Sequence, residues 1–371
     1  MKNQASFFVF DKVHGKENHP FNPDPGGWER FKNPLFPYPS FKKELASRGI
    51  DVSTPDINSI EESKYVFCWN NVLEFLKVAK KKPGQKWFLI IYDPPMFFGE
   101  NWDPAYHQDF DVVYTFDKSM VDNKKYFYAP LPVDTDYFKD FQSEITEDLF
   151  NSRKLNSLIA DNVYRYPYPG VRNSIVHLRY DILKWYGKNY PDEFSFYSNA
   201  FPKNNYFLAF RGNRFVKKLL PSALYSILAK FMQKDIRRIY QGPAPALEKF
   251  AKMRLHNFYT CFENTLGLNG YIDVKIFDCL YAGVVPIYLG ASNIEELIPY
   301  KCYVDVSKVD YKDPAVVYKI IKSINYKEYK NYIDEGKRFL TSKEFDLFKV
   351  KYFVEMLLRP IDSQLREAKA S

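Results

Sequence analysis

The chain has 371 residues, of which 46% are hydrophobic and 26% charged, and its formal net charge at neutral pH is +8. This length suits two domains of ordinary size, and the balance of apolar and charged residues excludes a disordered chain. The basic excess suggests an anionic partner, such as a nucleotide diphosphate, a phospholipid head group or a nucleic acid. Nucleic acid ranks last because the sequence has no arginine-rich arm, zinc-finger spacing or aromatic RNA-binding motif.

Residues 1–150 alternate apolar strands with helical stretches. We expect strands at Ser6–Phe10, Tyr65–Trp69, Lys86–Tyr92 and Asp111–Phe116, and helices at Phe41–Ser47 and Val72–Lys80. The Pro- and Gly-rich segment His19–Pro39 predicts a long surface loop, since proline disrupts the ladder of a sheet. The polar stretch Lys139–Lys154 predicts a domain boundary.

A second alternating series follows this boundary. Its expected elements are strands at Leu155–Asp161 and Phe194–Tyr197, and helices at Ser174–Gly187, Pro245–Leu255, Pro314–Ile324 and Phe345–Leu358. The sequence therefore predicts an α/β protein with an N-terminal domain at 1–150, a second α/β domain at 151–345 and a C-terminal helix at 346–371.

Residues 257–290 contain a strand, a polar loop, a helix and a second strand. The expected order is strand Asn257–Phe262, a loop that turns at Gly267 and Gly270, helix Tyr271–Ala282 ended by Gly283, and strand Val284–Leu289. In a βαβ unit of this kind the ligand binds at the carboxyl ends of the strands, beside a helix N-terminus suited to phosphate. The side chains expected to gather there are Glu263, Asn264, Tyr271, Asp273 and Lys275.

The run FENTLGLNGYIDVKIFDCLYAGVVPIYLG, residues 262–290, resembles the donor-binding block of the α-1,3/1,4-fucosyltransferases, glycosyltransferase family 10. That block reads FEN, a short loop, Y-(I/V)-T-E-K, a helix and A-G-x-V-P-(I/V)-x-x-G. Weaker similarity extends from Leu155 to about Asp310, with an N-terminal echo in Tyr92–Pro95 and Val121–Phe127. The resemblance covers about half the chain. It implies the GT-B architecture, two Rossmann-like domains facing each other across a cleft.

The resemblance also assigns donor-binding roles in the second domain. Lys275 stands at the lysine of the T-E-K triplet and is expected to contact phosphate. Arg179 is the second expected cation for the diphosphate, with Arg172 as a competitor and a plain surface role as the alternative. The other expected donor-binding residues are Glu263, Asn264, Tyr271 and Asp273. For Asn264 and Tyr271 the alternatives are a strand cap and a packing residue.

The chain departs from the family pattern at Val274, where the family has a glutamate that holds donor hydroxyl groups. On a helix, Asp273 would lie about 100° away from that position, so it could replace the glutamate only if the loop adjusts. This difference leaves the donor sugar open.

The expected catalytic base is Asp93, which follows the strand Lys86–Tyr92 where family members place a glutamate before Ser-Pro. Glu100 is the second catalytic candidate, and Asp103 and His107 are alternatives. A carboxylate before proline is also a common turn former, so a structural role for Asp93 stays open.

We predict no metal site and no cofactor beyond a nucleotide-diphosphate sugar as co-substrate. The triplet Asp134–Asp136 is a D-x-D, but helix capping explains it better. Residues 211–238 carry eight basic residues and an apolar arc, which predicts either peripheral membrane contact or a helix packed on the second domain. Because Met1–Gln4 lack the apolar core of a signal peptide, we expect a cytoplasmic protein, peripheral on the inner face of a membrane if 211–238 binds there.

Together these features predict an inverting glycosyltransferase that transfers L-fucose from GDP-fucose to a glycan hydroxyl. The expected acceptor is an oligosaccharide or lipid-linked glycan, such as a bacterial or viral surface glycan or lipopolysaccharide. Two alternatives stay open: the same fold with another nucleotide sugar, or a catalytically silent protein that binds glycan or membrane.

Overall fold

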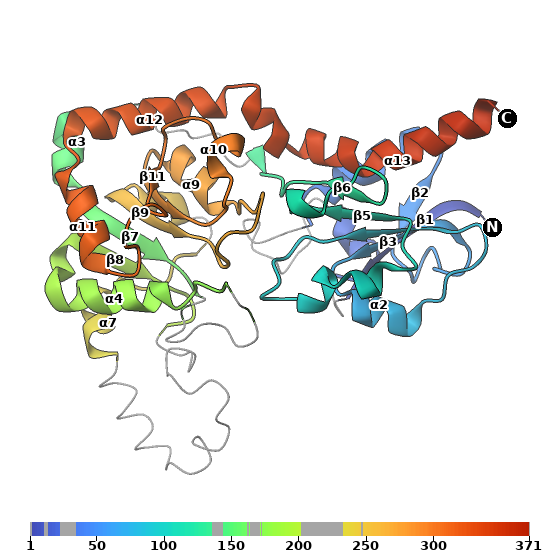
Figure 1. Cartoon of the computed structure of the whole chain (residues 1–371), viewed down its shortest axis with the longest axis horizontal. Helices are drawn as coiled ribbons and strands as arrows, with labels where there is room; N and C mark the ends of the chain where they lie inside the picture. The colour runs from blue at the N-terminus through green and yellow to red at the C-terminus, as the bar shows by residue number, and fades with distance from the viewer. Residues whose placement is uncertain are drawn as a thin grey trace, which may run out of the picture. The chain divides into compact units, whose positions relative to one another are not determined.

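The computed structural model describes residues 2–10, 14–22, 35–135, 144–161, 163, 171, 173–201, 233–245 and 248–370 (Figure 1). The chain forms two compact units. Unit 1 is Met1–Tyr137, Leu268–Ile272 and Lys343–Ser371, and unit 2 is Phe138–Gly267 and Asp273–Ser342. The predicted C-terminal helix therefore belongs to unit 1, and so do Leu268–Ile272, which are three residues of the predicted donor loop and the first two of the helix predicted after it.

Unit 1 is built on a six-stranded sheet in which every strand pair is parallel. Its strands are β1 (Lys2–Val9), β2 (Asp51–Ser53), β3 (Ser63–Trp69), β4 (Lys86–Ile90), β5 (Val112–Thr115) and β6 (Tyr126–Tyr128). The spatial order is β2-β1-β3-β4-β5-β6, so the direction of chain progress reverses between β1 and β3. A parallel sheet must be covered on both faces, which explains why its strands are nearly continuous apolar runs.

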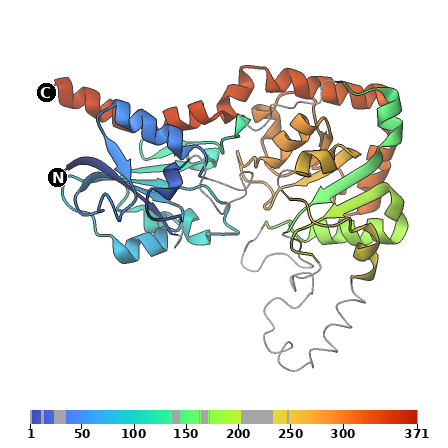
Figure 2. The same cartoon turned by 180° about the vertical axis from the view of Figure 1, so that it is seen from behind.

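Helices cover both faces of this sheet. Helices α1 (Tyr38–Ser47) and α13 (Val350–Ala370) lie side by side on one face (Figure 2), where the Arg48 and Asp362 side chains form an ion pair at 2.6 Å. Helix α2 (Val72–Val78) covers the other face, with Phe75 packed edge-on to Trp87. The apolar side of α13 closes the first core through Phe353, Leu357 and Ile361, and this burial is why the C-terminal helix joins unit 1.

Unit 2 has a five-stranded sheet, again with parallel pairs throughout. Its strands are β7 (Lys154–Ile159), β8 (Phe194–Tyr197), β9 (His256–Phe262), β10 (Val285–Leu289) and β11 (Val304–Asp305). The described helices of the unit are α3 (Glu147–Ser152), α4 (Leu178–Asn189), α7 (Lys234–Ile239), α8 (Lys249–Met253), α9 (Lys275–Ala282), α10 (Ile294–Leu297), α11 (Pro314–Ser323) and α12 (Tyr326–Leu340).

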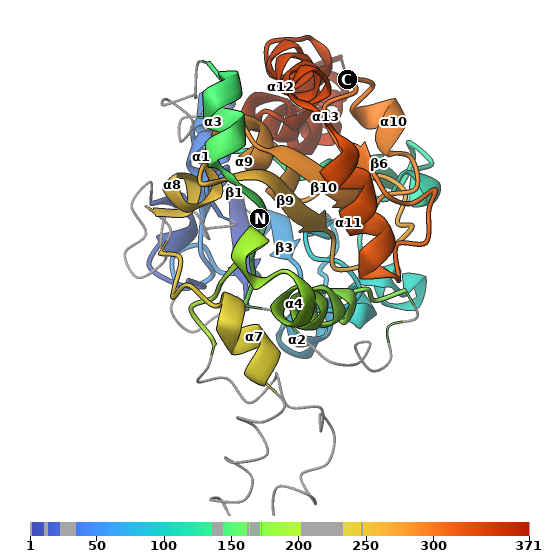
Figure 3. The ribbon, with the colours of Figure 1, turned by 90° about the vertical axis from the view of Figure 1, so that its left-hand side faces the viewer.

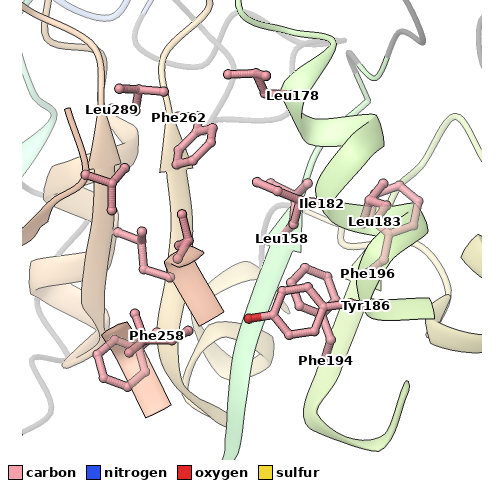
Figure 4. Packing of buried hydrophobic residues seen from close by; sticks show 14 of the residues in the cluster. Leu158, Leu178, Ile182, Leu183, Tyr186, Phe194, Phe196, Phe258, Phe262 and Leu289 are labelled. Atoms are coloured by element: carbon pink, nitrogen blue, oxygen red, sulfur yellow. The ribbon is translucent and has the colours of Figure 1, made fainter. Parts of the chain in front are cut away.

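The core of unit 2 lies between this sheet and α4. Figure 4 shows Leu178, Ile182 and Tyr186 of α4 directed at strand residues that include Phe258 and Phe262 of β9. Side chains alternate along a strand, so Cys261 faces the opposite side of the sheet, where it contacts Cys279 of α9. Helix α9 is thereby held against β9 by its apolar face.

Helix α4 also packs against α7 (Figure 3). A side chain at Gly187 of α4 could not be accommodated, because its Cβ would lie 2.1 Å from the carbonyl oxygen of Asp235. Ile236 and Ile239 of α7 are buried in this contact. Helix α7 and Gln233 are the described end of the basic segment; residues 211–232, on which the membrane prediction rests, lie outside the described residues.

Most strongly patterned elements occur where the sequence predicts them, and β8 matches to the residue. The predicted helix start at Tyr271 was wrong, because α9 begins at Lys275. Leu268–Ile272 pack in unit 1, and α9 follows them in unit 2. Helix α12 was not predicted, although its capping box of Asn325 and Glu328 is legible in the sequence.

Candidate active site

Five of the six predicted donor residues, all except Tyr271, belong to unit 2 and lie at its topological switch point. The strand order is β8-β7-β9-β10-β11, so the chain moves from β7 outward in both directions. Glu263 and Asn264 follow β9 directly, and Arg179 lies on α4, the helix that connects β7 to β8. Ligands of doubly wound sheets bind at the carboxyl ends of the strands at such a point. The strand order thus puts the residues of the motif where a doubly wound sheet binds its ligand.

Glu263 is the centre of this site and has no exposed surface. Its backbone N–H bonds to the carbonyl oxygen of Leu289 at 2.8 Å, continuing the β9–β10 ladder. Its carboxylate accepts the N–H of Asp273 at Oε1 (3.0 Å) and the Lys275 ammonium at Oε2 (2.8 Å). A Cβ at Gly290 would lie 2.3 Å from the Glu263 Cγ, so the glycine after β10 makes room for this side chain.

Lys275 is held between two carboxylates at the first residue of α9. Besides Glu263 it pairs with Asp273, whose other oxygen accepts the N–H of Val274 at 2.6 Å. An ammonium group has three donors, and these two contacts use two of them. The Lys275 side chain is 19% exposed and that of Asp273 26% exposed, so both reach solvent while Glu263 does not.

The three ionisable groups respond differently to this shared burial. Burial raises the pKa of Glu263, and the charge of Lys275 offsets only part of the effect. Burial also favours a higher pKa for Asp273, but the attraction of Lys275 outweighs it and the pKa lies below the usual carboxyl value. Burial alone would lower the pKa of Lys275, but Asp273 and Glu263 hold it above the ordinary lysine value. Lys275 is therefore a charged ammonium at neutral pH.

Arg179 and Asn264 form a second, adjoining contact. The Arg179 side chain is almost fully buried, and its Nη2 donates to the carbonyl oxygens of Phe262 (2.7 Å) and Glu263 (3.2 Å) and to Oδ1 of Asn264 (2.9 Å). This nitrogen thus fixes the carboxyl end of β9 and the amide of Asn264. The predicted diphosphate contact of Arg179 stays a prediction.

One ion pair beside the site was missed by the sequence analysis. Lys249 of α8 pairs with the buried Asp278 of α9, one turn beyond Lys275. Burial raises the pKa of Asp278, and the charge of Lys249 opposes this shift; the same lysine also helps to lower the pKa of Asp273. The carboxylate at i+3 from Lys275 was a possible signal, but its partner comes from another helix.

Tyr271 packs within unit 1. It belongs to the Leu268–Ile272 segment of unit 1, is 2% exposed, and its ring centre is 5.0 Å from that of Phe116. Gly270 permits this packing, since it has a positive φ of 99° and its Cβ position is 2.3 Å from the carbonyl oxygen of Phe116. The packing alternative for Tyr271 agrees with this position, and its nucleotide contact stays a prediction.

Asp93 and Glu100 both lie in unit 1, beyond the carboxyl end of β4. Asp93 is half-buried and held by Asn70, whose Nδ2 donates to the Asp93 Oδ2 at 2.9 Å. Trp102 Nε1 donates to the backbone carbonyl of Asp93 at 3.1 Å. Glu100 is part of a short 3-10 helix, Gly99–Trp102, and is partly exposed.

The two alternatives to these carboxylates are committed to local structure. The carboxylate of Asp103 accepts the N–H of Ala105 at 2.9 Å and caps the next 3-10 helix. His107 is fully buried, with Nδ1 3.0 Å from Tyr126 Oη and Nε2 2.9 Å from the Asn101 carbonyl oxygen. Burial lowers the pKa of His107, so it stays neutral in this contact.

The described part of the chain has neither a metal-binding cluster nor a membrane-spanning helix. It contains no group of three or more His, Cys, Asp or Glu residues placed to hold a metal ion. It also contains no helix with the length and apolar character needed to span a bilayer. Asp136 of the D-x-D triplet and Arg172 lie outside the described residues.

Comparison with known sequences identifies the C-terminal part of the chain. Residues 224–353 match the model of glycosyltransferase family 10 (fucosyltransferase), C-terminal region. A 111-residue stretch is 29% identical to the 3-galactosyl-N-acetylglucosaminide 4-alpha-L-fucosyltransferase FUT3 of Bos taurus and covers 29% of this chain and 30% of that protein. An 86-residue stretch is 36% identical to the human 4-galactosyl-N-acetylglucosaminide 3-alpha-L-fucosyltransferase 9 and covers 22% and 23%. The aligned stretches thus span less than a third of these relatives.

Comparison with solved structures supports the fold over the whole chain. Sucrose-phosphate synthase from Thermosynechococcus elongatus aligns with a TM-score of 0.56 over 99% of this chain and 100% of its own, at 9% identity. At this identity the likeness shows the fold alone, and the two parallel α/β units are those of the GT-B architecture. Over residues 224–353 the chain is thus similar to the C-terminal region of the family 10 fucosyltransferases.

Proposed function

We propose that this protein is an inverting glycosyltransferase that transfers L-fucose from GDP-fucose to a glycan hydroxyl, on a bacterial or viral surface glycan or lipopolysaccharide. The single observation that carries the proposal is the placement of Lys275. Its ammonium lies at the start of α9, beside the carboxyl end of β9 and at the switch point of a parallel sheet. The fucosyl donor is supported by the names of the matched relatives.

The leaving group needs positive charge at the moment its bond to the sugar breaks. In the proposed reaction the acceptor oxygen bonds to C1 of the sugar while the bond between C1 and the phosphate oxygen breaks. The electron pair of the breaking bond leaves with GDP. The charged Lys275 and the backbone N–H groups at the start of α9 stabilise the departing pyrophosphate. These groups serve the role that a divalent metal has in other transferases, so we propose that no metal is required.

The acceptor hydroxyl must lose a proton as it attacks. We assign this proton to the Asp93 carboxylate, with Glu100 as the second candidate. Attack on the face opposite the leaving group in a single displacement inverts the configuration at C1. The anomeric configuration of the product, read by NMR from a transfer reaction, tests this step directly.

Asp273 bears on the identity of the donor. It is the partly exposed carboxylate beside Lys275, next to the position where Val274 replaces the family's glutamate. Because Asp273 and Val274 precede α9, the direction of the Asp273 side chain is not fixed by helical geometry. We propose that it accepts hydrogen bonds from donor hydroxyl groups in place of the missing glutamate.

Thermal shift measurements against a panel of GDP- and UDP-sugars, followed by a GDP-release assay with glycan acceptors, test the proposal. We expect GDP-fucose and GDP to raise the melting temperature and GDP-fucose to support transfer. A shift with a UDP-sugar but none with GDP-fucose would overturn the fucosyl assignment. Lys308→Met is the matched control for Lys275→Met, because Lys308 is 68% exposed and lies on the same unit away from β9.

A further inference from the structure

Asn70 occupies in unit 1 the place that Glu263 occupies in unit 2, because the backbone N–H of each continues the ladder to the next strand. It directly follows β3, and the strand order β2-β1-β3-β4-β5-β6 puts the switch point of this sheet between β1 and β3. Its backbone is left-handed, with a φ of 52°, and its side chain is 1% exposed. Asparagine tolerates this conformation better than most residues, so the local fold accounts for its type only in part.

The two ends of the Asn70 amide serve different groups. Its Oδ1 accepts the backbone N–H groups of Tyr92 (2.8 Å) and Asp93 (3.2 Å), which ties the end of β4 to the end of β3. Its Nδ2 donates to the carboxylate of Asp93 at 2.9 Å. Because a backbone N–H requires an acceptor and an ionised carboxylate requires a donor, the orientation of this amide is fixed by its partners.

These contacts separate a structural role from a functional one. Tying β3 to β4 needs only the acceptor oxygen, which an aspartate at this position would also supply. The donor nitrogen is used on the Asp93 carboxylate, whose backbone carbonyl is in turn held by Trp102 Nε1 at 3.1 Å. Asp93 is therefore restrained at its N–H, its C=O and one carboxylate oxygen, so its side chain keeps one orientation.

We infer that Asn70 is the positioning residue for the catalytic base, fixing the Asp93 carboxylate in the orientation that receives the acceptor's proton. The inference rests on the proposed function, since it takes Asp93 as the base. Because Asn70 is 1% exposed, we assign it no contact with the sugar or the nucleotide, and it acts through Asp93. A base held in one orientation contributes to rate because misplacement by about 1 Å can cost about 10²-fold.

The variant Asn70→Asp tests this role, because it keeps the acceptor oxygen for the backbone but replaces the donor with a second carboxylate, which repels that of Asp93. We expect kcat for transfer to fall by about 10²-fold while the KM for the donor stays unchanged. Asn71→Asp is the matched control: Asn71 has nearly the same backbone, with a φ of 51°, and its side chain makes no capping hydrogen bond to α2. If Asn70→Asp folds poorly, Asn70→Gly replaces it as the test variant, because glycine also adopts a positive φ without strain.

A double-mutant cycle with Asp93→Asn separates action through Asp93 from a general loss of structure. If Asn70 works through Asp93, Asn70→Asp changes kcat by less than about twofold once Asp93→Asn is present. An equal loss in both backgrounds, or wild-type kcat for a folded Asn70→Asp protein, would overturn the inference. Loss of activity in Asn70→Asp but full activity in Asp93→Asn would instead refute Asp93 as the base.

A readout that needs no activity keeps the two proposals distinguishable. The chain has five tryptophans, so the indole ¹⁵N–¹H resonance of Trp102 can be assigned by comparison with Trp102→Phe. Because this group bonds to the Asp93 carbonyl, its resonance should move in Asn70→Asp and not in Asn71→Asp. If the resonance moves in Asn70→Asp but the wild-type protein transfers no sugar, the Asn70–Asp93 link is supported and the proposed function is refuted. An unmoved resonance overturns the link.

Discussion

Replacing Lys275 with methionine should destabilise the protein in a way that depends on pH. The change removes the cation that pairs with Glu263, a side chain with no exposed surface, at 2.8 Å. The carboxylate can then stay charged without that partner or take up a proton. At about pH 7, protonating a carboxyl group of ordinary pKa 4.5 costs about 3 kcal/mol, at about 1.4 kcal/mol per pH unit. That cost is an upper limit on the part of the penalty that comes from the charge of Glu263, since its neutral form is always accessible; the ion pair with Asp273 is lost in addition.

The same limit falls to about 1 kcal/mol at about pH 5.5. The sign follows from the direction of the shift: burial raises the pKa of Glu263, and removal of Lys275 raises it further, so the folded variant binds more protons than the unfolded chain. The stability of Lys275→Met should therefore improve relative to wild type as the pH falls. Urea unfolding of both proteins at the two pH values measures the difference. A deficit that is absent at neutral pH, or that grows on acidification, would refute the reasoning.

A second substitution separates the structural role of Lys275 from the proposed catalytic one. Glu263→Gln keeps an acceptor for the Asp273 N–H and removes the buried charge, so it should restore most of the stability lost in Lys275→Met. Glycosyl transfer should stay abolished in the double variant, because no ammonium is left to stabilise the pyrophosphate. Recovery of both stability and transfer would show that Lys275 serves the fold alone.

Three further predictions concern Gly290, Arg179 and His256, all in unit 2. Gly290→Ala places a methyl group against the Glu263 side chain, so it should destabilise unit 2 by about 1–3 kcal/mol and raise the KM for the donor. The control is Gly99→Ala, which should leave stability unchanged because no atom lies within 4 Å of the added Cβ. Arg179→Lys cannot reproduce the contacts of Nη2 with two carbonyls and Asn264, and urea unfolding should show a loss of about 1.5–3 kcal/mol; an unchanged midpoint would contradict this. Burial lowers the pKa of His256 from 6.5 to about 4, so the unfolded chain binds the extra proton and about 3 kcal/mol of stability should be lost between about pH 6.5 and 4. His256→Phe should flatten this part of the stability profile, and a profile of unchanged slope would argue against the buried neutral imidazole.

Local sequence determined the elements whose pattern is strong and self-contained. The apolar runs of β3, β4, β8 and β9 and the glycine stop of α9 are set by side chains within each segment, so their places were predictable. The motif after β9 likewise predicted that Glu263, Asp273 and Lys275 meet, because a short strand–loop–helix unit brings them together whatever lies elsewhere.

Contacts between distant segments decided the rest. The start of α9 depends on Glu263 accepting the Asp273 N–H and on Leu268–Ile272 packing in unit 1, neither of which local periodicity encodes. Asn70 reads as an ordinary turn residue until β3 and β4 pair and bring Asp93 to its amide nitrogen. The sequence by itself thus determined the donor motif and the order of the strands along the chain. Which polar groups face each other at the carboxyl ends of those strands was decided by strand pairing and helix packing, because hydrogen bonds and ion pairs join residues that only the folded chain brings within reach.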